Sequence, residues 1–390
     1  MSTILVTGAS GAFGSHLASR LLDEGHEVIS FKHDERPVTT AKLLGIEDQI
    51  TWVRGSITDE RLCKRVIADF EVDSIFHLAA LPIVQVGTRT TQPIFETNFG
   101  GTINLLEAVR ENTWAGKHVR FIYVSTDKVY GDAGGKPYTE DMPLNGLGIY
   151  ECSKAAADLA ARTYANAGFA PKLVIARPCN LILPGDLNFG RVLPRMIIPC
   201  LRGDSPTLYR TSYLREFMDV RDAVEALIEL DEALVRDDVE TGGAFNVGSG
   251  EQRTLDQVVA AVMKHFPKIE PKWTEAPAIS RIEIPFQTLS TDKIQHVLGW
   301  KAKYTFEQSI DHLVKWWRDV YPVLPHAIRN TRIEDWHGGT SSSPVAATRR
   351  RVKVEVECSA CGGRGQLNCG SLGTVDCEVC HGRGKHSSVD

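Results

Sequence analysis

The chain of 390 residues lacks several features that would place it in a broad functional class at once. No apolar run approaches the roughly 20 residues that a membrane-spanning helix needs, so we expect no membrane partner. No charge of one sign dominates: 44 Lys and Arg against 49 Asp and Glu give a formal net charge of −5, which offers no overall attraction to nucleic acid. The first residues carry no basic n-region or cleavage site, so a secretory signal is not expected.

Cysteine is scarce in most of the chain: four are scattered through the first 340 residues, and the other five lie between Cys358 and Cys380. Such clustering favours a local metal site in a reducing compartment over a disulfide framework, and we expect a cytoplasmic protein. The length allows two domains or more with a large buried core.

What the sequence does contain begins with a glycine-rich turn between a strand and a helix. The apolar strand Ile4 to Val6 is followed by Thr-Gly-Ala-Ser-Gly-Ala-Phe-Gly and by a helix that we expect from Ser15 to Glu24. Glycine lets the backbone turn tightly and approach a pyrophosphate at a helix N-terminus. The pattern predicts a dinucleotide site, the alternative being a turn with incidental glycines. Its expected residues are Gly8, Ser10, Gly11, Ala12, Phe13 and Gly14.

The end of the second strand, His26 to Phe31, bears on the choice of cofactor. A carboxylate there would bind the adenosine ribose and favour NAD. Lys32 stands there instead, with His33 and Arg36 close behind, and basic groups can hold the 2′-phosphate of NADP. The alternative is a solvated loop without a phosphate contact, so the cofactor is expected to be NAD or NADP with a lean to NADP.

Two further strand ends complete the expected cofactor site. Ser56 and Ile57 follow a third strand and should lie along the adenine. A fourth strand, from Ser74, runs into Leu78, Ala79 and Ala80, whose small side chains would let the backbone pass close to the nicotinamide half. On the fourth strand itself, His77 is expected to be packed rather than catalytic.

The residues best suited to chemistry follow the fifth strand, Val119 to Val124. Thr126, Asp127 and Lys128 stand where its C-terminal end should be, and ligands bind at that edge of an open α/β sheet. Tyr150 and Lys154 are four residues apart, so they share a face of the next helix. An ammonium beside a phenol favours the phenolate, which makes tyrosine a usable base near neutral pH.

Alternating strands and helices predict an α/β fold with a doubly wound parallel sheet. We expect residues 1–178 to form a dinucleotide-binding domain, to which 216–248 returns. Residues 179–330 should be mainly a smaller substrate-binding lobe, 331–350 a linker and 351–390 a separate module. In the lobe, Arg191 and Arg215 suit an anionic group, because guanidinium binds phosphate bidentately, although a surface role is open for each.

These residues together resemble the extended short-chain dehydrogenase/reductase family that acts on nucleotide sugars, over roughly Thr3 to Tyr321. Further marks are Arg177 with Asn180, Arg215 in Leu-Arg-Glu-Phe, and Leu298-Gly299-Trp300. Within the family, Thr126-Asp127-Lys128 and the loop Gly185 to Arg191 are most similar to CDP-glucose 4,6-dehydratases. The resemblance implies that Arg177 belongs with the cofactor and Asn180, Arg191, Arg215 and Thr126 with the substrate.

The implied reaction is a nucleotide-sugar 4,6-dehydration. Tyr150 takes the proton of the sugar 4-hydroxyl while hydride goes to the cofactor, Lys154 tunes Tyr150, and Thr126 bonds the 4-oxygen. Asp127 protonates the leaving C6 hydroxyl, and hydride then returns to C6. Lys128 matches the position of the C5 base but must be neutral to act; the alternative is that it merely pairs with Asp127. The dTDP-sugar dehydratases carry a glutamate where Lys128 stands.

The family resemblance also implies a homodimer, formed by helices expected over Pro93 to Glu111 and Tyr150 to Ala167. Two other functions remain open at this point. One is a nucleotide-sugar epimerase of the same family, which uses Tyr150 and Lys154 without eliminating water. The other is an NADP-binding sensor or scaffold, although such a protein has no use for an intact base.

The tail departs from the family pattern. After a linker rich in glycine and serine, Cys358-x-x-Cys361 and Cys377-x-x-Cys380 appear with fifteen residues between the pairs. Four thiolates at this spacing suit one tetrahedral zinc ion, the alternative being a tail of free thiols. The repeated Gly-Arg-Gly after each pair resembles the cysteine-rich zinc repeats of the DnaJ chaperone family. A protein partner for this module is a further expectation.

Overall fold

The computed structural model describes residues 1–82, 91–275 and 284–329, and four short strands in the tail. The chain divides into two compact units, residues 1–340 and 341–390, and each is described by itself. Within the described residues, no helix is long and apolar enough to cross a membrane.

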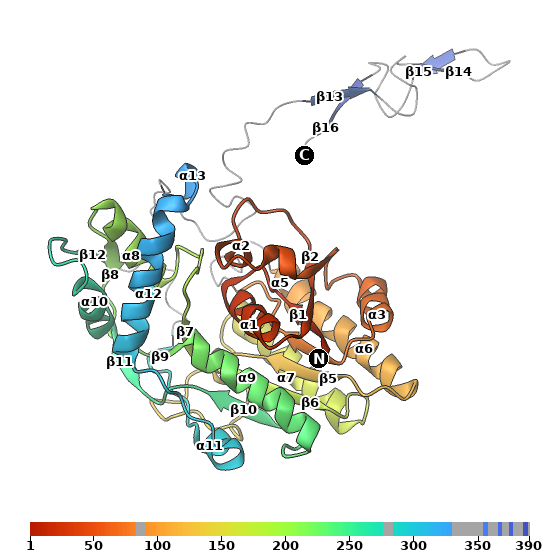
Figure 1. Cartoon of the computed structure of the whole chain (residues 1–390), viewed down its shortest axis with the longest axis horizontal. Helices are drawn as coiled ribbons and strands as arrows, with labels where there is room; N and C mark the ends of the chain where they lie inside the picture. The colour runs from red at the N-terminus through yellow and green to blue at the C-terminus, as the bar shows by residue number, and fades with distance from the viewer. Residues whose placement is uncertain are drawn as a thin grey trace. The chain divides into compact units, whose positions relative to one another are not determined.

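A parallel sheet of seven strands forms the centre of the first unit (Figure 1). Its order is β10-β6-β5-β4-β1-β2-β3, and every neighbouring pair runs parallel. The chain order reverses between β1 and β4, which makes a switch point there and confirms the doubly wound sheet. The strands are β1 (Thr3–Thr7), β2 (Glu27–Lys32), β3 (Thr51–Arg54), β4 (Ser74–His77), β5 (Arg120–Val124), β6 (Leu173–Pro178) and β10 (Ala244–Val247).

Helices cover both faces of this sheet. Helix α1 packs against α2 and α9 on one face, while α6 packs against α3 and α7 on the other. These helices are α1 (Ala12–Asp23), α2 (Thr40–Leu43), α3 (Glu60–Asp69), α6 (Gly101–Trp114), α7 (Ile149–Asn166) and α9 (Val220–Arg236). Before α6 come α5 (Gln92–Phe95) and the π-helical turn η2 (Glu96–Gly100), and the 3-10 turns η1 (Glu47–Gln49) and η3 (Asp127–Tyr130) lie in loops.

The alternation of side chains along β1 explains the two layers. Ile4 and Val6 belong to the buried cluster shared with α1 and α9, whereas Leu5 belongs to the cluster shared with α3 and α6. Successive strand residues point to opposite faces, so an all-apolar strand must be covered twice. Helix α1 begins at Ala12 rather than at Ser15, because Gly11 is already its N-cap.

A smaller group of elements lies beside the C-terminal part of the sheet. A three-stranded sheet runs β11-β9-β7, and β12 pairs with β8. Helix α12 packs against α8, α10 and β9, as Figure 1 shows. The strands are β7 (Asn180–Ile182), β8 (Thr207–Tyr209), β9 (Leu214–Asp219), β11 (Gln252–Thr254) and β12 (Lys272–Thr274). The helices are α8 (Val192–Arg202), α10 (Leu255–Met263), α11 (Asp292–Leu298), α12 (Phe306–Val320), η5 (Tyr321–Val323) and α13 (His326–Arg329).

The segment 216–248, expected to return to the first domain, is divided between these two parts. Its helix α9 packs on β5 and β6, and β10 extends the main sheet, but β9 belongs to the three-stranded sheet. In the second unit, β13 (Val354–Glu357) pairs antiparallel with β16 (Lys385–Ser388), and β14 (Gln366–Asn368) with β15 (Thr374–Asp376). The predicted domain boundaries stay a prediction.

Candidate active site

The glycine-rich turn after β1 has the shape that close backbone approach requires. Gly8 has a φ of +80°, and a Cβ on it would lie 3.1 Å from the backbone of Ala79. A Cβ on Gly14 would lie 2.3 Å from the carbonyl oxygen of Gly8, which no side chain can tolerate. Gly11 donates its N–H to that same carbonyl oxygen and caps α1. Ser10, Ala12 and Phe13 complete this turn, so the residues fit a dinucleotide cradled at the helix N-terminus.

The end of β4 is tied to this turn through Thr7. The backbone N–H groups of Leu78 and Ala79 donate to Thr7 Oγ1 at 3.1 and 3.0 Å, and Ala80 follows them. His77 is buried between hydroxyls, with Nδ1 2.8 Å from Thr7 Oγ1 and Nε2 bonded to a second threonine. His77 is thus packed, as expected, and its burial lowers its pKa.

Beyond β3, the two residues expected along the adenine have different surroundings. Ile57 is buried, and a Cβ on Gly101 of α6 would lie 2.5 Å from its side chain. Ser56 turns its hydroxyl toward the backbone N–H of Thr58, 3.2 Å away. Ile57 packs against α6 and Ser56 braces the loop, and their place along the adenine stays a prediction.

Lys32, at the end of β2, is paired with carboxylates. Its Nζ lies 2.8 Å from Glu47 and 3.1 Å from Glu35, and these partners raise its pKa, the hydrogen bond to Glu47 most of all. Of the other two basic residues expected here, Arg36 pairs with Asp34, and the His33 ring lies 3.7 Å from the same carboxylate. The basic side chains that suggested a phosphate site already have anionic partners.

Arg177 was expected with the cofactor, and in the structure its guanidinium is held by other protein groups. Its side chain is fully buried on β6, where both oxygens of Asp158 accept hydrogen bonds from it at 3.0 and 2.9 Å. Its remaining nitrogen donates to the Tyr130 hydroxyl and the Glu140 carbonyl oxygen. These four hydrogen bonds let Arg177 brace α7 against the sheet.

Thr126 and Asp127 lie just past the end of β5, as expected from the sequence. Thr126 donates a hydrogen bond to Asp127 Oδ1 at 3.0 Å and caps the turn η3. The Asp127 carboxyl is buried, and its Oδ2 has no hydrogen-bond partner among the described residues. Burial raises the pKa of Asp127 against the opposing charges of Lys128 and Arg215. A carboxyl with a raised pKa is suited to donate a proton.

Tyr150 and Lys154 are four residues apart on α7, and Lys154 is buried. Burial raises the pKa of Tyr150, and the charge of Arg191 is the largest influence opposing it. Thr126 lowers that pKa further through a hydrogen bond. Lys154 donates to the carbonyl oxygen of Val124 at 2.7 Å, and burial lowers its pKa to about 7. The structure thus brings Thr126, Tyr150 and Lys154 together at the C-terminal edge of β5.

Lys128 does not make its ion pair with its neighbour in sequence. Its Nζ lies 3.6 Å from Oε1 of Glu151, a buried side chain in the first turn of α7. Glu151 is not among the site residues expected from the sequence, although a carboxylate directly after the tyrosine is a visible signal. Glu216 on β9 is another such residue: burial raises its pKa to about 6, and it accepts backbone hydrogen bonds from Leu289 and Gly250.

The residues expected to bind substrate surround this group from the smaller lobe. Arg191 pairs with Asp186 at 3.1 Å while its charge reaches Tyr150, and Arg215 acts on Asp127 in the same way. The guanidinium of Arg215 also lies 5.0 Å from the Tyr213 ring. Asn180 donates its amide to the Glu216 carbonyl oxygen at 3.1 Å, which ties β7 to β9.

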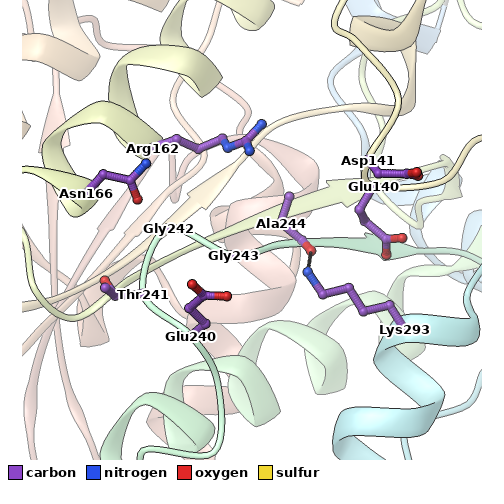
Figure 2. Close-up of a pocket in the computed structure, with 10 residues that line it drawn as sticks. All are labelled: Glu140, Asp141, Arg162, Asn166, Glu240, Thr241, Gly242, Gly243, Ala244 and Lys293. Atoms are coloured by element: carbon purple, nitrogen blue, oxygen red, sulfur yellow. Dashed lines mark hydrogen bonds between the residues drawn. The ribbon is translucent and has the colours of Figure 1, made fainter.

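A separate surface pocket of about 480 Å³ contains none of these residues. Figure 2 shows its lining: the turn before β10, the C-terminal half of α7, and the side chains of Glu140 and Lys293. Lys293 donates to the Ala244 carbonyl oxygen and Glu140 accepts from the Asn246 N–H, so the two side chains cover the open edge of β10. This pocket begins where β10 begins, whereas ligands of parallel sheets bind where strands end.

The four cysteines expected to hold zinc, Cys358, Cys361, Cys377 and Cys380, lie outside the described residues. In the part of the chain that the structure describes, no group of three His, Cys, Asp or Glu side chains could hold a metal ion.

The chain is similar to several known proteins. The model of the NAD dependent epimerase/dehydratase family matches residues 4–248. The dTDP-glucose 4,6-dehydratase of Xanthomonas campestris pv. campestris is 30% identical over 337 residues, which cover 81% of this chain and 93% of that protein. The CDP-glucose 4,6-dehydratase of Salmonella typhimurium is 24% identical over 326 residues, covering 80% and 89%. The crystal structure of Bacillus anthracis dTDP-glucose 4,6-dehydratase in complex with NAD superposes with a TM-score of 0.71 at 26% identity, covering 82% and 97%.

Proposed function

The chain belongs to the NAD dependent epimerase/dehydratase family, and from this premise we propose that it is a nucleotide-sugar 4,6-dehydratase. It converts a nucleoside-diphosphate hexose into the 4-keto-6-deoxy sugar with loss of one water molecule. Relatives named as 4,6-dehydratases of dTDP-glucose and CDP-glucose support this activity. They differ in the nucleotide, so the base of the substrate stays open.

The observation that carries the proposal is the buried carboxyl of Asp127 beside Thr126. Loss of the C6 hydroxyl needs a proton donor, because hydroxide is a poor leaving group. Asp127 has an oxygen without a hydrogen-bond partner, and burial raises its pKa, so it can hold a proton until the substrate arrives. An epimerase that only oxidises and reduces C4 has no step for this acid.

The other residues have roles that follow from their positions. Tyr150 takes the proton of the 4-hydroxyl, and Thr126 donates a hydrogen bond to the 4-oxygen. A bound NAD⁺ would supply the chemistry of accepting a hydride and giving it back, held by the turn from Gly8 to Gly14. Lys154, fixed on the Val124 carbonyl, keeps a positive charge near Tyr150 when protonated, and the charge of Arg191 assists it.

We infer that the cofactor is NAD rather than NADP, which reverses the lean that Lys32 and Arg36 suggested. Glu47 and Glu35 neutralise Lys32, and a 2′-phosphate would have to approach both carboxylates. Repulsion between like charges at a few ångströms costs roughly 1 kcal/mol or more even when solvent screens it. The NAD in the B. anthracis structure supports the same choice.

The homodimer and the zinc module remain part of this proposal. For the dimer, Leu159 is half exposed (50%) in the middle of α7, one of the two helices expected to pair. For the zinc module, β13 ends directly before Cys358 and β15 directly before Cys377, so each Cys-x-x-Cys pair follows a paired strand. Metal analysis of the purified chain should give one zinc, and a Cys358→Ser, Cys377→Ser variant none.

An absorbance assay separates the candidate functions. Products with a 4-keto-6-deoxy sugar gain absorbance in alkali, so a dehydratase gives a signal with dTDP-glucose, CDP-glucose or UDP-glucose. An epimerase gives a product without that absorbance, and a sensor or scaffold gives no product. Absence of the signal with all three sugars would contradict the dehydratase.

A further inference from the structure

One buried carboxylate of the active site has no role in the chemistry described above. Glu151 lies directly after Tyr150 in the first turn of α7, and its side chain is only 8% exposed. Its Oε2 is buried without a hydrogen-bond partner among the described residues, while Oε1 lies 3.6 Å from Lys128 Nζ. Burying a carboxylate with an unused acceptor is costly, so a structural role alone accounts poorly for it.

Two glycines leave the space that this carboxylate occupies. A Cβ on Gly148 would lie 2.2 Å from Glu151 Oε2, and a Cβ on Gly146 would lie 2.6 Å from the Glu151 backbone. The loop before α7 is therefore shaped around Glu151. The N-terminus of α7 also carries a partial positive charge, which favours a carboxylate in the first turn.

A local explanation is that Glu151 caps the helix. It is the third helical residue, from which a glutamate can reach back to the N-cap N–H. Here the N-cap is Gly148, but the oxygen nearest to it, Oε2, makes no hydrogen bond. The carboxylate instead faces Lys128. Capping therefore does not explain its orientation.

Lys128, the position that the resemblance assigns to the C5 base, is paired with the carboxylate of Glu151. Glu151 faces its Nζ, and Asp127 precedes it in the chain. The Lys128 Nζ lies against Oε1 of Glu151, whereas Oε2 of the same carboxylate has no hydrogen-bond partner among the described residues. The site needs a base at C5, and a carboxylate oxygen with unused lone pairs can accept that proton.

We propose that Glu151 is the catalytic base that removes the C5 proton, and that Lys128 is a positioning residue that holds this carboxylate. The assignment rests on the proposed dehydratase function. The C5–H bond breaks, its proton goes to Glu151, and its electron pair forms the double bond to C6 as the C6–O bond breaks. Asp127 gives its proton to the departing hydroxyl, and one water is released. The proton on Glu151 exchanges with solvent, and when the hydride returns to C6, Glu151 gives a solvent-derived proton to C5.

The test uses Glu151→Gln, which preserves the shape of the side chain, in the full-length protein. Wild type and variant are incubated with NAD⁺ and with dTDP-glucose, CDP-glucose and UDP-glucose in deuterated water. Wild type should yield a dehydrated product with deuterium at C5. In Glu151→Gln, the absorbance of reduced nicotinamide should rise as in wild type, whereas water loss and deuterium incorporation should fall by about 100-fold or more.

Two further variants complete the comparison. Glu307→Gln, in the exposed first turn of α12, should behave as wild type. Lys128→Met should slow water loss and narrow its pH range without preventing deuterium incorporation. If Lys128 is the base, Lys128→Met will stop at reduced nicotinamide and Glu151→Gln will turn over within a few-fold of wild type, which overturns the assignment.

The remaining outcomes are also decisive. If folded Glu151→Gln fails to reduce nicotinamide, Glu151 acts before the C5 step and the assignment is wrong. If Glu151→Gln does not fold, Glu151→Ala with added formate replaces it: restored deuterium incorporation supports the base, and no restoration overturns it. If wild type itself dehydrates none of the three sugars, the proposed function fails visibly, and the base assignment fails with it.

Discussion

Lys154 Nζ donates a hydrogen bond to the carbonyl oxygen of Val124, 2.7 Å away, and so joins α7 to the end of β5. The Tyr123 ring lies 4.2 Å from the same nitrogen, and the side chain is almost fully buried. Burial lowers the pKa of Lys154 from 10.5 to about 7, while the charge of Asp158 acts in the opposite direction. Burial therefore brings the pKa of Lys154, four residues after Tyr150 on α7, close to neutral.

This shift predicts how stability depends on pH. Between about 7 and 10.5 the unfolded chain holds a proton on Lys154 that the folded protein has released, so the stability contribution rises with pH across this window. Below this pH range Lys154 is a buried ammonium in the folded protein, and burying that charge lowers the free energy of unfolding by its full amount. Relative to Lys154→Met, wild type should therefore gain stability from pH 7 to pH 10, by a few kcal/mol at most.

Urea unfolding at the two pH values measures this difference. Lys268→Met, at an exposed position, is the matched control and should show no such pH dependence relative to wild type. An equal stability difference between wild type and Lys154→Met at both pH values would show that the lysine keeps an ordinary pKa.

A second prediction concerns Asp127. Asp127→Asn keeps the shape of the side chain but removes the proton donor for the C6 hydroxyl. We expect water loss to slow by about 100-fold or more while oxidation at C4 continues. Rapid-quench mass spectrometry of the bound sugar measures both steps. Asp256→Asn, at the exposed start of α10, is the control, and unchanged water loss in Asp127→Asn would remove Asp127 as the acid.

A third prediction follows from the pairing of Lys32 with Glu47. Wild type should bind NAD⁺ more tightly than NADP⁺, because Glu35 and Glu47 neutralise the lysine. Glu47→Gln frees part of that charge, so it should strengthen NADP⁺ binding by roughly 5- to 10-fold and leave NAD⁺ binding little changed. Fluorescence titration gives both dissociation constants. Glu27→Gln, exposed on β2, is the control. If wild type binds NADP⁺ more tightly than NAD⁺, the inferred preference for NAD is wrong.

A fourth prediction concerns the pair of Arg177 and Asp158, which is fully buried. Arg177→Met leaves the Asp158 carboxylate buried without its cation, which should cost about 3 to 5 kcal/mol of unfolding free energy. The affinity for NAD⁺ should stay near that of wild type, because the buried guanidinium of Arg177 is bonded to Asp158, Tyr130 and Glu140. Arg61→Met, at an exposed position, should change neither quantity, and loss of NAD⁺ affinity in a folded Arg177→Met would restore Arg177 to the cofactor site.

Much of the fold could be predicted from local pattern. Short-range patterns in the sequence indicate two apolar strands, Ile4 to Val6 and Phe121 to Val124, and a glycine-rich turn after the first. The structure has both strands in its parallel sheet. The spacing of Tyr150 and Lys154 likewise placed both on one helix. These features depend on neighbouring residues, which a sequence displays directly.

The partners of charged side chains could not be predicted in this way. Lys32 meets Glu47 and Arg177 meets Asp158 only because the fold brings separate elements together. The ion pair that the sequence suggested for Lys128 was with its neighbour Asp127. In the structure its ion-pair partner is Glu151, 23 residues further along the chain. The direction of a side chain depends on the packing around it. For Glu151, this packing includes the space left by Gly146 and Gly148.

The proposed activity of this protein is the removal of water from a nucleotide sugar. Its most direct test is mass spectrometry of dTDP-glucose, CDP-glucose and UDP-glucose after incubation with the full-length protein and NAD⁺. We expect at least one of them to become lighter by the mass of one water molecule. A product of unchanged mass with an inverted C4, seen by NMR, would contradict the dehydratase in favour of the epimerase, and no product from any sugar would contradict both.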